Sequence, residues 1–370
     1  MRAAALTLAA LAAAALAGCG PAEFGEDFDE GWEEGGASVL WEADVGAVGR
    51  RQAMHQLGGT VCLVNEEGVI LLIDAATGAV ESPALINFDG PVRASGGCTR
   101  SKAVTVDGAG AVQAHDWRNP ARDWRKQLDG NLIGAPLQVA NTLLAILNDG
   151  TVVAYAMFTG DELWRLELNE SEFRYDGKFK PRVEEYHVAF GTPEGTLYYI
   201  DTIDGFIVWE GRLFNERDPD PTANLSLIAG PDVAAGVACA AAYNGAAGCF
   251  GADGRPLWQK DLSSAGTVRI VDGHVHLVSA SGTLLALATR DGRERWRTAG
   301  ASSHRSPMVA ARGDLLVVEN GFSGLSFFEA ATGELAGGIE LDGEIIDYIE
   351  TGDGLLVLGS DGVLSRIAID

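Results

Sequence analysis

A tight turn built around glycine recurs along this chain roughly every 40 residues, the kind of period that marks proteins made of repeated supersecondary units. Asn65 with Gly68, and Asn148 with Gly150, show the pattern: residues that tolerate a positive φ lie between two apolar runs, as in a β-hairpin. The turn glycines are Gly68, Gly110, Gly150, Gly195, Gly245, Gly282, Gly324 and Gly362. Eight such hairpins predict eight equivalent β-units.

A second turn follows most of the hairpins, and a tryptophan follows that turn. Trp164, for example, stands four residues after Gly160, whereas repeats 1 and 7 have Ser82 and Gly337 in the tryptophan position. A lone four-stranded sheet cannot cover both of its faces, so we expect these aromatic side chains to fill the wedge between neighbouring sheets. The tryptophans of this pattern are Trp41, Trp124, Trp164, Trp209, Trp258 and Trp296.

These repeats predict an all-β fold, an eight-bladed β-propeller of four-stranded antiparallel blades, over residues 38–370. A chain of 370 residues exceeds the roughly 250–300 at which a single core stops growing, unless it repeats a small unit. After Gly362 the chain supplies only one more strand, 363–369. We therefore expect the N-terminal strand at 38–45 to complete the last blade, which removes two exposed sheet edges.

The first 36 residues differ from the repeats. Residues 1–18 carry an early charge, an apolar run and small residues, which predicts a signal peptide, with no stretch long enough for a confident membrane span. The sequence 16–19 is similar to the lipobox of bacterial lipoproteins, so Cys19 is the predicted lipidation site; a plain signal peptide with an incidental cysteine is the alternative. The residue after Cys19 is Gly20 and not the Asp that marks retention in the inner membrane, so the outer membrane is the predicted location. Residues 19–37 are densely acidic and predict a lipidated tether.

Charge excludes one class of partner. The chain has 27 Lys and Arg against 52 Asp and Glu, a formal net charge of −25, and no basic cluster interrupts this field. Because phosphate backbones are themselves anionic, the sequence predicts no binding of nucleic acid.

The repeat resembles the PQQ-type propeller repeat, with its pattern Ala-x-Asp-x-x-Thr-Gly-x-x-x-Trp, most clearly at 72–78, 154–164 and 199–209. Together with the lipobox and the eight blades, the mature chain resembles the BamB family of lipoprotein subunits of the bacterial β-barrel assembly machinery, its C-terminal half most closely. The resemblance implies a non-enzymatic scaffold without cofactor, anchored in the outer membrane and facing the periplasm. Its implied partner is the barrel-inserting subunit, a BamA-like protein with periplasmic POTRA domains; unfolded outer-membrane proteins are a further candidate.

No catalytic or metal-binding residues stand out. Only His274 and His276 among the scattered histidines share a strand face, and without a visible third ligand we expect two half-exposed strand residues. One alternative function is a quinoprotein dehydrogenase, an enzyme that shares the propeller repeat. Those enzymes look longer and carry two adjacent cysteines beside the quinone, whereas Cys239 and Cys249 are separated by ten positions. Another is a ligand-binding or adhesion propeller with its site in the central funnel.

Cys239 and Cys249 are also the candidate disulfide. If Tyr243, Asn244 and Gly245 form a three-residue hairpin loop, counting back places the two cysteines directly opposite each other, close enough for a bridge in an exported protein. Two free core cysteines are the alternative. Cys62 and Cys98 remain as a candidate second pair.

The candidate partner site is an irregular insertion before the hairpin of the fourth repeat. Phe173, Arg174, Tyr175 and Asp176 combine aromatic and charged side chains, as interface hot spots do. By resemblance, the corresponding BamB loop carries alternating apolar residues followed by Arg and contacts the barrel-inserting subunit. Phe173 and Tyr175 match the apolar pair, whereas Asp176 stands where Arg is expected, a role that Arg174 could take. The alternative is a loop whose aromatic side chains fold back onto the blade.

Overall fold

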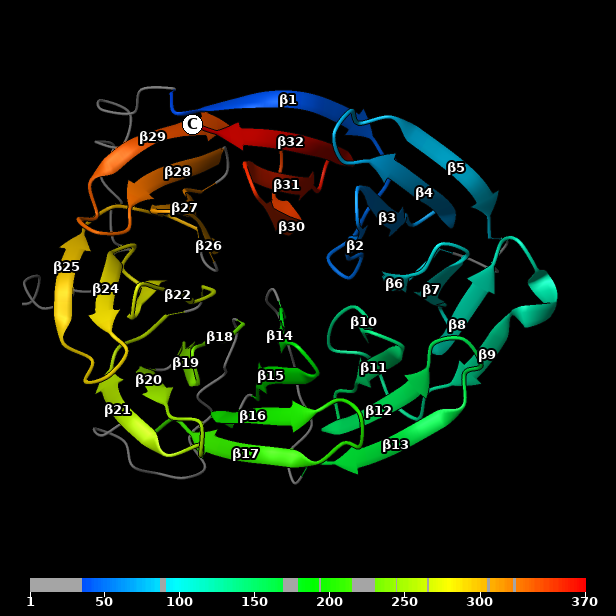
Figure 1. Ribbon diagram of the computed structural model, residues 1–370, viewed down its shortest axis with the longest axis horizontal. Coiled ribbons are helices and arrows are strands. Elements are labelled where there is room, and N and C mark those ends of the chain that lie inside the picture. The colour runs from blue at the N-terminus through cyan, green and yellow to red at the C-terminus, as the bar shows by residue number, and fades with distance from the viewer. Residues whose placement is uncertain are drawn as a thin grey trace, which may run out of the picture. The chain divides into compact units, whose positions relative to one another are not determined.

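The computed structural model describes residues 35–86, 91–168, 179–192, 194–214, 230–243, 245–264, 266–304, 307–321 and 324–370. The folded unit, Glu33–Asp370, contains eight four-stranded antiparallel sheets that follow one another around a ring (Figure 1). The predicted all-β, eight-bladed propeller is confirmed. Apart from strands, this part of the chain contains a short 3-10 helix, η2 (Pro120–Arg122).

Each blade begins at the centre of the ring and proceeds outward. The innermost strands of blades 1 to 8 are β2 (His55–Leu57), β6 (Ala94–Cys98), β10 (Leu137–Val139), β14 (Arg182–Glu184), β18 (Asp232–Ala234), β22 (Arg269–Val271), β26 (Val309–Arg312) and β30 (Ile345–Thr351). The second strands are β3 (Thr60–Val64), β7 (Lys102–Val106), β11 (Thr142–Ile146), β15 (His187–Gly191), β19 (Val237–Ala242), β23 (His274–Val278), β27 (Leu315–Glu319) and β31 (Gly354–Gly359).

The outer half of each blade is a third strand and an edge strand. The third strands are β4 (Val69–Asp74), β8 (Ala111–Asp116), β12 (Thr151–Ala156), β16 (Thr196–Asp201), β20 (Ala246–Phe250), β24 (Leu284–Ala288), β28 (Gly324–Glu329) and β32 (Val363–Ile369). The edge strands are β5 (Val80–Leu85), β9 (Trp124–Gln127), β13 (Glu162–Glu167), β17 (Ile207–Arg212), β21 (Pro256–Asp261), β25 (Glu294–Thr298), β29 (Leu335–Glu340) and, in blade 8, β1 (Ala37–Asp44).

The N-terminal strand closes the ring, as predicted. β1 pairs antiparallel with β32, from Ala37 opposite Ile369 to Asp44 opposite Val363, so blade 8 combines the two ends of the folded chain. The strand begins at Ala37, one residue earlier than expected from the sequence. This closure gives the last blade its fourth strand.

The hairpin glycines occupy the turns assigned to them, except Gly324, which is the first residue of β28. Gly68 and Gly150 have φ values of 82° and 85°, in the left-handed region that favours glycine over residues with a Cβ. These turns join the second and third strands. Because the strands alternate in direction, the turns lie at the same face of the ring as the connections from one blade to the next; we call this the hairpin face.

The tryptophans fill the wedges between blades. Trp164 of blade 3 lies over Gly205, in the outer turn of blade 4, and its indole nitrogen donates a 3.1 Å hydrogen bond to the carbonyl oxygen of Thr202. The same arrangement recurs for Trp124 over Gly160, Trp209 over Gly254, Trp258 over Gly292, Trp296 over Gly333 and, across the ring closure, Trp41 over Gly78. The prediction that these tryptophans fill the wedges between neighbouring blades is therefore confirmed.

The core is divided in the same way. Eight clusters of buried apolar side chains each draw residues from two adjacent blades. Leu143 of blade 3, for example, packs with Val104 of blade 2, and both are completely buried. A blade is therefore stabilised mainly by its neighbours, as expected for a repeat fold.

Candidate functional site

Two of the sequence-predicted sites fall outside the described residues: the lipidation residue Cys19 and the docking segment 173–176. Both remain predictions. The structure does describe the frame on each side of the docking segment, where blade 3 ends at Leu168 and the chain resumes at Phe179 on the hairpin face. The site is therefore built from this frame and from the innermost strands beside it.

Phe179 fixes the chain where it enters blade 4. Its ring packs edge-on against Phe190 of β15, with 6.3 Å between ring centroids, within the apolar cluster shared by blades 3 and 4. Gly134 of blade 3 leaves it room, since a Cβ there would lie 2.8 Å from the Cδ1 atom of Phe179. Phe179 follows the docking segment in the same insertion, and its ring folds back onto the blade.

Lys180, the next residue, extends to the opposite side of the ring. Its Nζ lies 2.9 Å from Oδ1 of Asp347 and 2.9 Å from the carbonyl oxygen of Tyr348, both on β30. The ammonium also lies 3.3 Å from the centroid of the Tyr348 ring, a cation–π contact. Burial is the strongest single influence and acts to lower the pKa of Lys180, but the charge and hydrogen bond of Asp347, together with Tyr348 and Glu350, outweigh it, and the pKa is raised. Lys180 is therefore a cation at neutral pH.

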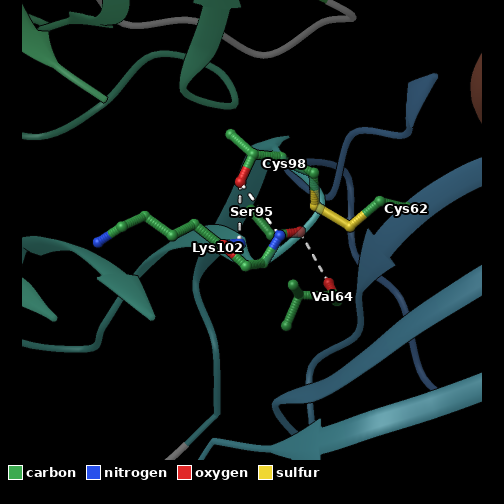
Figure 2. Close-up of a disulfide and its surroundings, with 7 residues drawn as sticks. Cys62, Val64, Ser95, Cys98 and Lys102 are labelled. Carbon is green, nitrogen blue, oxygen red and sulfur yellow. Dashed lines mark hydrogen bonds between the residues drawn. A yellow bond between two sulfur atoms is a disulfide. The ribbon is translucent and has the colours of Figure 1, made fainter. Parts of the chain in front are cut away.

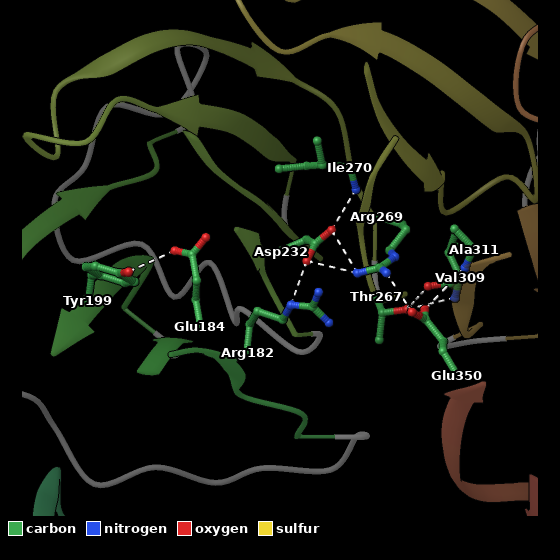
Figure 3. A network of polar contacts seen from close by, with 10 residues as sticks. All are labelled: Arg182, Glu184, Tyr199, Asp232, Thr267, Arg269, Ile270, Val309, Ala311 and Glu350. Carbon is green, nitrogen blue, oxygen red and sulfur yellow. Dashed lines mark hydrogen bonds and ion pairs between the residues drawn. The ribbon is translucent and has the colours of Figure 1, made fainter. Parts of the chain in front are cut away.

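A network of charged side chains joins the innermost strands of neighbouring blades (Figure 3). Asp232 of β18, only 2% exposed, lies between Arg182 of β14 and Arg269 of β22, with N···O distances of 3.0 and 3.3 Å. Arg269 continues to Glu350 of β30 at 2.6 Å, and Glu350 accepts a hydrogen bond from the backbone N–H of Ala311. Opposite charges pair at each step, so the network links blades 4 to 8 and presents no surface of a single sign to a charged ligand.

One constellation resembles hydrolytic chemistry but cannot perform it. In blade 2, Oγ1 of Thr105 lies 3.3 Å from Nε2 of His115, whose Nδ1 lies 3.8 Å from Asp123. This is the order of a nucleophile, a base and an orienting acid. However, Thr105 is completely buried, so no substrate carbonyl can approach its hydroxyl. Burial also lowers the pKa of His115, as expected for a residue held in the blade.

The expectation that His276 is half-exposed is wrong. Its side chain is 1% exposed, packs against Trp296 with 5.6 Å between ring centroids, and faces the carbonyl oxygen of Ala330 in blade 7. Burial lowers the pKa of His276 to about 4, so the ring is neutral at neutral pH. His274, its neighbour on the strand face, is partly exposed. Within the described ranges, no group of three or more His, Cys, Asp or Glu side chains is placed to hold a metal ion.

Cys239 and Cys249 occupy the register that was predicted for them. They lie directly opposite each other on β19 and β20, with Cα atoms 4.1 Å apart and sulfur atoms at the bonding distance of 1.99 Å. Ala242 opposite Ala246 closes the hairpin, as the loop-counting argument required. Because the two cysteines face each other across a hairpin, they do not form the adjacent pair that quinoproteins carry.

The second candidate pair links two blades. Cys62 on β3 of blade 1 and Cys98 on β6 of blade 2 form a disulfide with Cα atoms 6.3 Å apart (Figure 2). Beside it, the hydroxyl of Ser95 donates a 2.7 Å hydrogen bond to the carbonyl oxygen of Val64, so a polar contact also joins the two blades there. The side chain of Lys102 extends away from the disulfide, and its Nζ donates to the carbonyl oxygen of Arg122.

The fold agrees with the comparisons with known proteins. A family model described as "Outer membrane protein assembly factor BamB" matches residues 33–298, which is most of the propeller. The chain belongs to the BamB family. As a member of this family of assembly factors, it is a non-enzymatic protein, in agreement with the prediction.

Individual relatives in the BamB family are distant but cover nearly the whole chain. The "Outer membrane protein assembly factor BamB" of Bordetella pertussis is 24% identical over 334 residues, which is 86% of each chain. That of Burkholderia pseudomallei is 26% identical over 339 residues, 87% of this chain and 86% of the relative. The crystal structure of BamB from Moraxella catarrhalis has the same fold, with a TM-score of 0.73 and 18% identity over 90% of this chain and 99% of that one.

Blade 4 differs from the other blades of this BamB-family chain in its surface. Six of its large apolar side chains are exposed, whereas no other blade has more than two among the described residues. Five of them lie at or next to the turns opposite the hairpin face, where β17 begins, and Phe214 lies just after the end of β17, at the hairpin face. These side chains are Phe214, Val208, Ile207, Phe206, Ile203 and Tyr186. Apolar surface gathered in this way marks interaction sites.

Neither the Lys180–Asp347 contact nor the network of charged side chains on the innermost strands was predictable from the sequence, because their members lie far apart in the chain. Lys180 and Asp347 are separated by 167 residues, and only the closure of the ring brings them together.

Within the described ranges, no helix has the length and apolarity that crossing a membrane requires.

Proposed function

We propose that this BamB-family protein is a lipid-anchored, non-enzymatic scaffold that acts in the assembly of outer-membrane β-barrel proteins. The observation that carries the proposal is the family match over residues 33–298, since the relatives are named outer-membrane protein assembly factors. The anchor is the lipid attached to Cys19, and the acidic tether leads from it to the propeller in the periplasm.

The partner that we propose is the barrel-inserting subunit, through its periplasmic domains. Its docking segment is 173–176, where Phe173 and Tyr175 supply the apolar contacts. Arg174 supplies the positive charge, since Asp176 stands where the family pattern has Arg. Two observations on the described residues support blade 4 as the location: the blade has the most exposed apolar side chains, and Phe179 and Lys180, the first described residues after the segment, are fixed by contacts with blades 4 and 8. A rigid frame lowers the entropy lost when a partner binds.

The two alternative functions have less support. A quinone site would need the adjacent cysteine pair, and in this chain Cys239 and Cys249 face each other across a hairpin. A ligand site in the funnel would need open, unpaired polar groups. Instead, the charged side chains of the innermost strands pair with one another.

The test is co-purification of the barrel-inserting subunit from the cell envelope with the double variant Phe173→Ala, Tyr175→Ala. We expect this variant to lose the partner while its thermal melt stays near that of the wild type. A matched control on blade 5, Tyr243→Ala with Leu257→Ala, removes two side chains that are 51% and 43% exposed and should keep the partner. Co-purification of the first variant at wild-type yield would overturn the docking assignment.

A further inference from the structure

Five exposed apolar side chains of blade 4 lie together at the face opposite the hairpin face, and we call them the blade 4 patch. They are Tyr186, Ile203, Phe206, Ile207 and Val208. Phe206 is 71% exposed and Ile203 is 63% exposed, the two highest values among the large apolar side chains of the described residues. Single exposed apolar side chains are ordinary, but a group of five on one blade marks a surface that another molecule covers.

Hydrogen bonds hold the blade 4 patch on a rigid support. The backbone N–H and the hydroxyl of Thr202 both donate to the carbonyl oxygen of Tyr186, at 2.8 and 2.7 Å. Tyr186 therefore lies beside the turn that carries Ile203 and Phe206. The indole nitrogen of Trp164 in blade 3 donates to the carbonyl oxygen of Thr202 and fixes the turn from the neighbouring blade. Side chains presented on a rigid turn lose less entropy when a partner binds them.

Blade 6 has the same turn with the opposite surface chemistry. There the backbone N–H and the hydroxyl of Thr289 donate to the carbonyl oxygen of Gly273, as those of Thr202 do to Tyr186 in blade 4. The four positions that are apolar in the turn and edge strand of blade 4 are exposed and charged in blade 6, where they are Arg290, Arg293, Glu294 and Arg295. The propeller therefore does not need apolar side chains at these positions, and packing does not explain them in blade 4.

The charge around the blade 4 patch selects the kind of partner. Residues 183–210 include six Asp and Glu and no Lys or Arg. Two of these acidic residues, Glu185 and Asp204, are exposed and adjoin residues of the patch in the sequence. Their charge repels an anionic lipid surface, and it repels the same acidic surface of a second copy. Apolar side chains flanked by Lys or Arg are attracted instead.

We infer that the blade 4 patch binds a protein segment whose apolar side chains are flanked by Lys or Arg. The apolar contacts supply most of the affinity, and the carboxylates around them select for a cationic partner. Leu168, the last described residue before the proposed docking segment, is hydrogen-bonded to Gly150 in a turn of the hairpin face, whereas the patch lies at the opposite face. The inference therefore goes beyond the proposed function and does not depend on it.

The test is the binding of two labelled peptides to the purified full-length protein, measured by fluorescence anisotropy. In the first peptide Phe and Leu alternate with Lys, and in the second peptide Glu replaces each Lys. We expect the first peptide to bind the wild type, more weakly as salt is added, and the second peptide not to bind. The double variant Ile203→Ser, Phe206→Ser should bind the first peptide at least about tenfold more weakly. Its thermal melt should stay near that of the wild type, because both side chains are exposed.

The matched control is the double variant Leu257→Ser, Leu335→Ser. It removes two exposed apolar side chains from the same face, in blades 5 and 7, and leaves the charge of the protein unchanged, so it should bind the first peptide like the wild type. If the serine pair in blade 4 lowers the melt, Ile203→Arg with Phe206→Arg takes its place. Blade 6 has arginine at both equivalent positions, so this variant should fold, and it should also lose the peptide.

Several outcomes would overturn the inference. Equal binding of the two peptides, wild-type binding by the blade 4 variant, or an equal loss in the control would each do so. Sedimentation tests the other occupants: association with vesicles of phosphatidylethanolamine and phosphatidylglycerol, or self-association, that the serine pair in blade 4 abolishes would assign the patch to a membrane or to a second copy. If that variant loses the barrel-inserting subunit but keeps the peptide, the patch belongs to the docking site and the inference fails, while the proposed function stands.

Discussion

The indole ring of Trp164 lies directly over Gly205, so that a Cβ on Gly205 would come within 2.6 Å of its Cδ2 atom. The glycine belongs to blade 4 and the tryptophan to blade 3. The φ of Gly205, +79°, is also one that residues with a Cβ avoid. The same contact, of a tryptophan with a glycine of the next blade, recurs around most of the ring. Its contribution to stability can be tested by mutation.

Replacing this glycine should weaken the interface between blades. We expect Gly205→Ala to lower the free energy of unfolding by about 3 kcal/mol, because the methyl group both strains the backbone and displaces the indole ring. Gly58→Ala is the matched control: its φ is +67°, and nothing lies within 4 Å of the added Cβ, so only the backbone term of about 1 kcal/mol applies. Urea denaturation measures both, and equal losses would contradict the packing role of the joint.

The two disulfides should differ in their contributions. Cys62 and Cys98 are 36 residues apart, whereas Cys239 and Cys249 are 10 apart. In the chain-entropy model the longer loop gives the larger effect, about 4 against about 3 kcal/mol. We therefore expect the double alanine variant of the first pair to melt at the lower temperature. Peptide mapping without reduction should recover both bridges, and free thiols at these positions would exclude them.

His276 should make the fold sensitive to mild acid. Burial lowers the pKa of His276 to about 4 in the folded chain, below the ordinary value of 6.5 in the unfolded chain. Between these values the unfolded state binds a proton that the folded state does not. The contribution is therefore complete above pH 6.5 and is lost as the pH falls toward 4, by up to about 3 kcal/mol.

The check is the unfolding free energy of wild type and His276→Gln at pH 7 and pH 4.5. The wild type should lose more stability than the variant over this interval, since the amide does not titrate. Parallel losses in the two proteins would show that His276 does not carry the effect.

Lipidation at Cys19 is tested by fractionation. Several acyl chains together hold a protein on a membrane stably, whereas one chain gives only marginal binding. We expect Cys19→Ala to move the protein from the membrane fraction to the periplasm. A variant that stays with the membranes in unchanged amount would show that the anchor lies elsewhere.

The parts of the fold that follow from local sequence were predictable. Each hairpin is specified by a turn glycine between two short apolar runs, and the register of Cys239 with Cys249 follows from counting along one such hairpin. The number of blades and the donated strand β1 follow from the period and from the strand missing after Gly362.

The contacts that depend on closing the ring were not predictable in this way. Cys62 and Cys98 could be offered only as the cysteines left over, because the distance between them depends on how two separate blades pack. His276 was expected to be half-exposed for the same reason: a strand pattern does not show which face the next blade covers. Lys180 gave no signal at all, since its partner Asp347 belongs to the opposite blade.

The central claim, that this BamB-family chain docks the barrel-inserting subunit through blade 4, is tested most directly by site-specific photo-cross-linking in intact cell envelopes. A photoreactive residue replaces Tyr175 in one strain and Leu257, on blade 5, in a control strain, and mass spectrometry identifies what is attached. We predict that position 175 captures the periplasmic domains of the barrel-inserting subunit and that position 257 does not. Capture at neither position, or equally at both, would contradict the account.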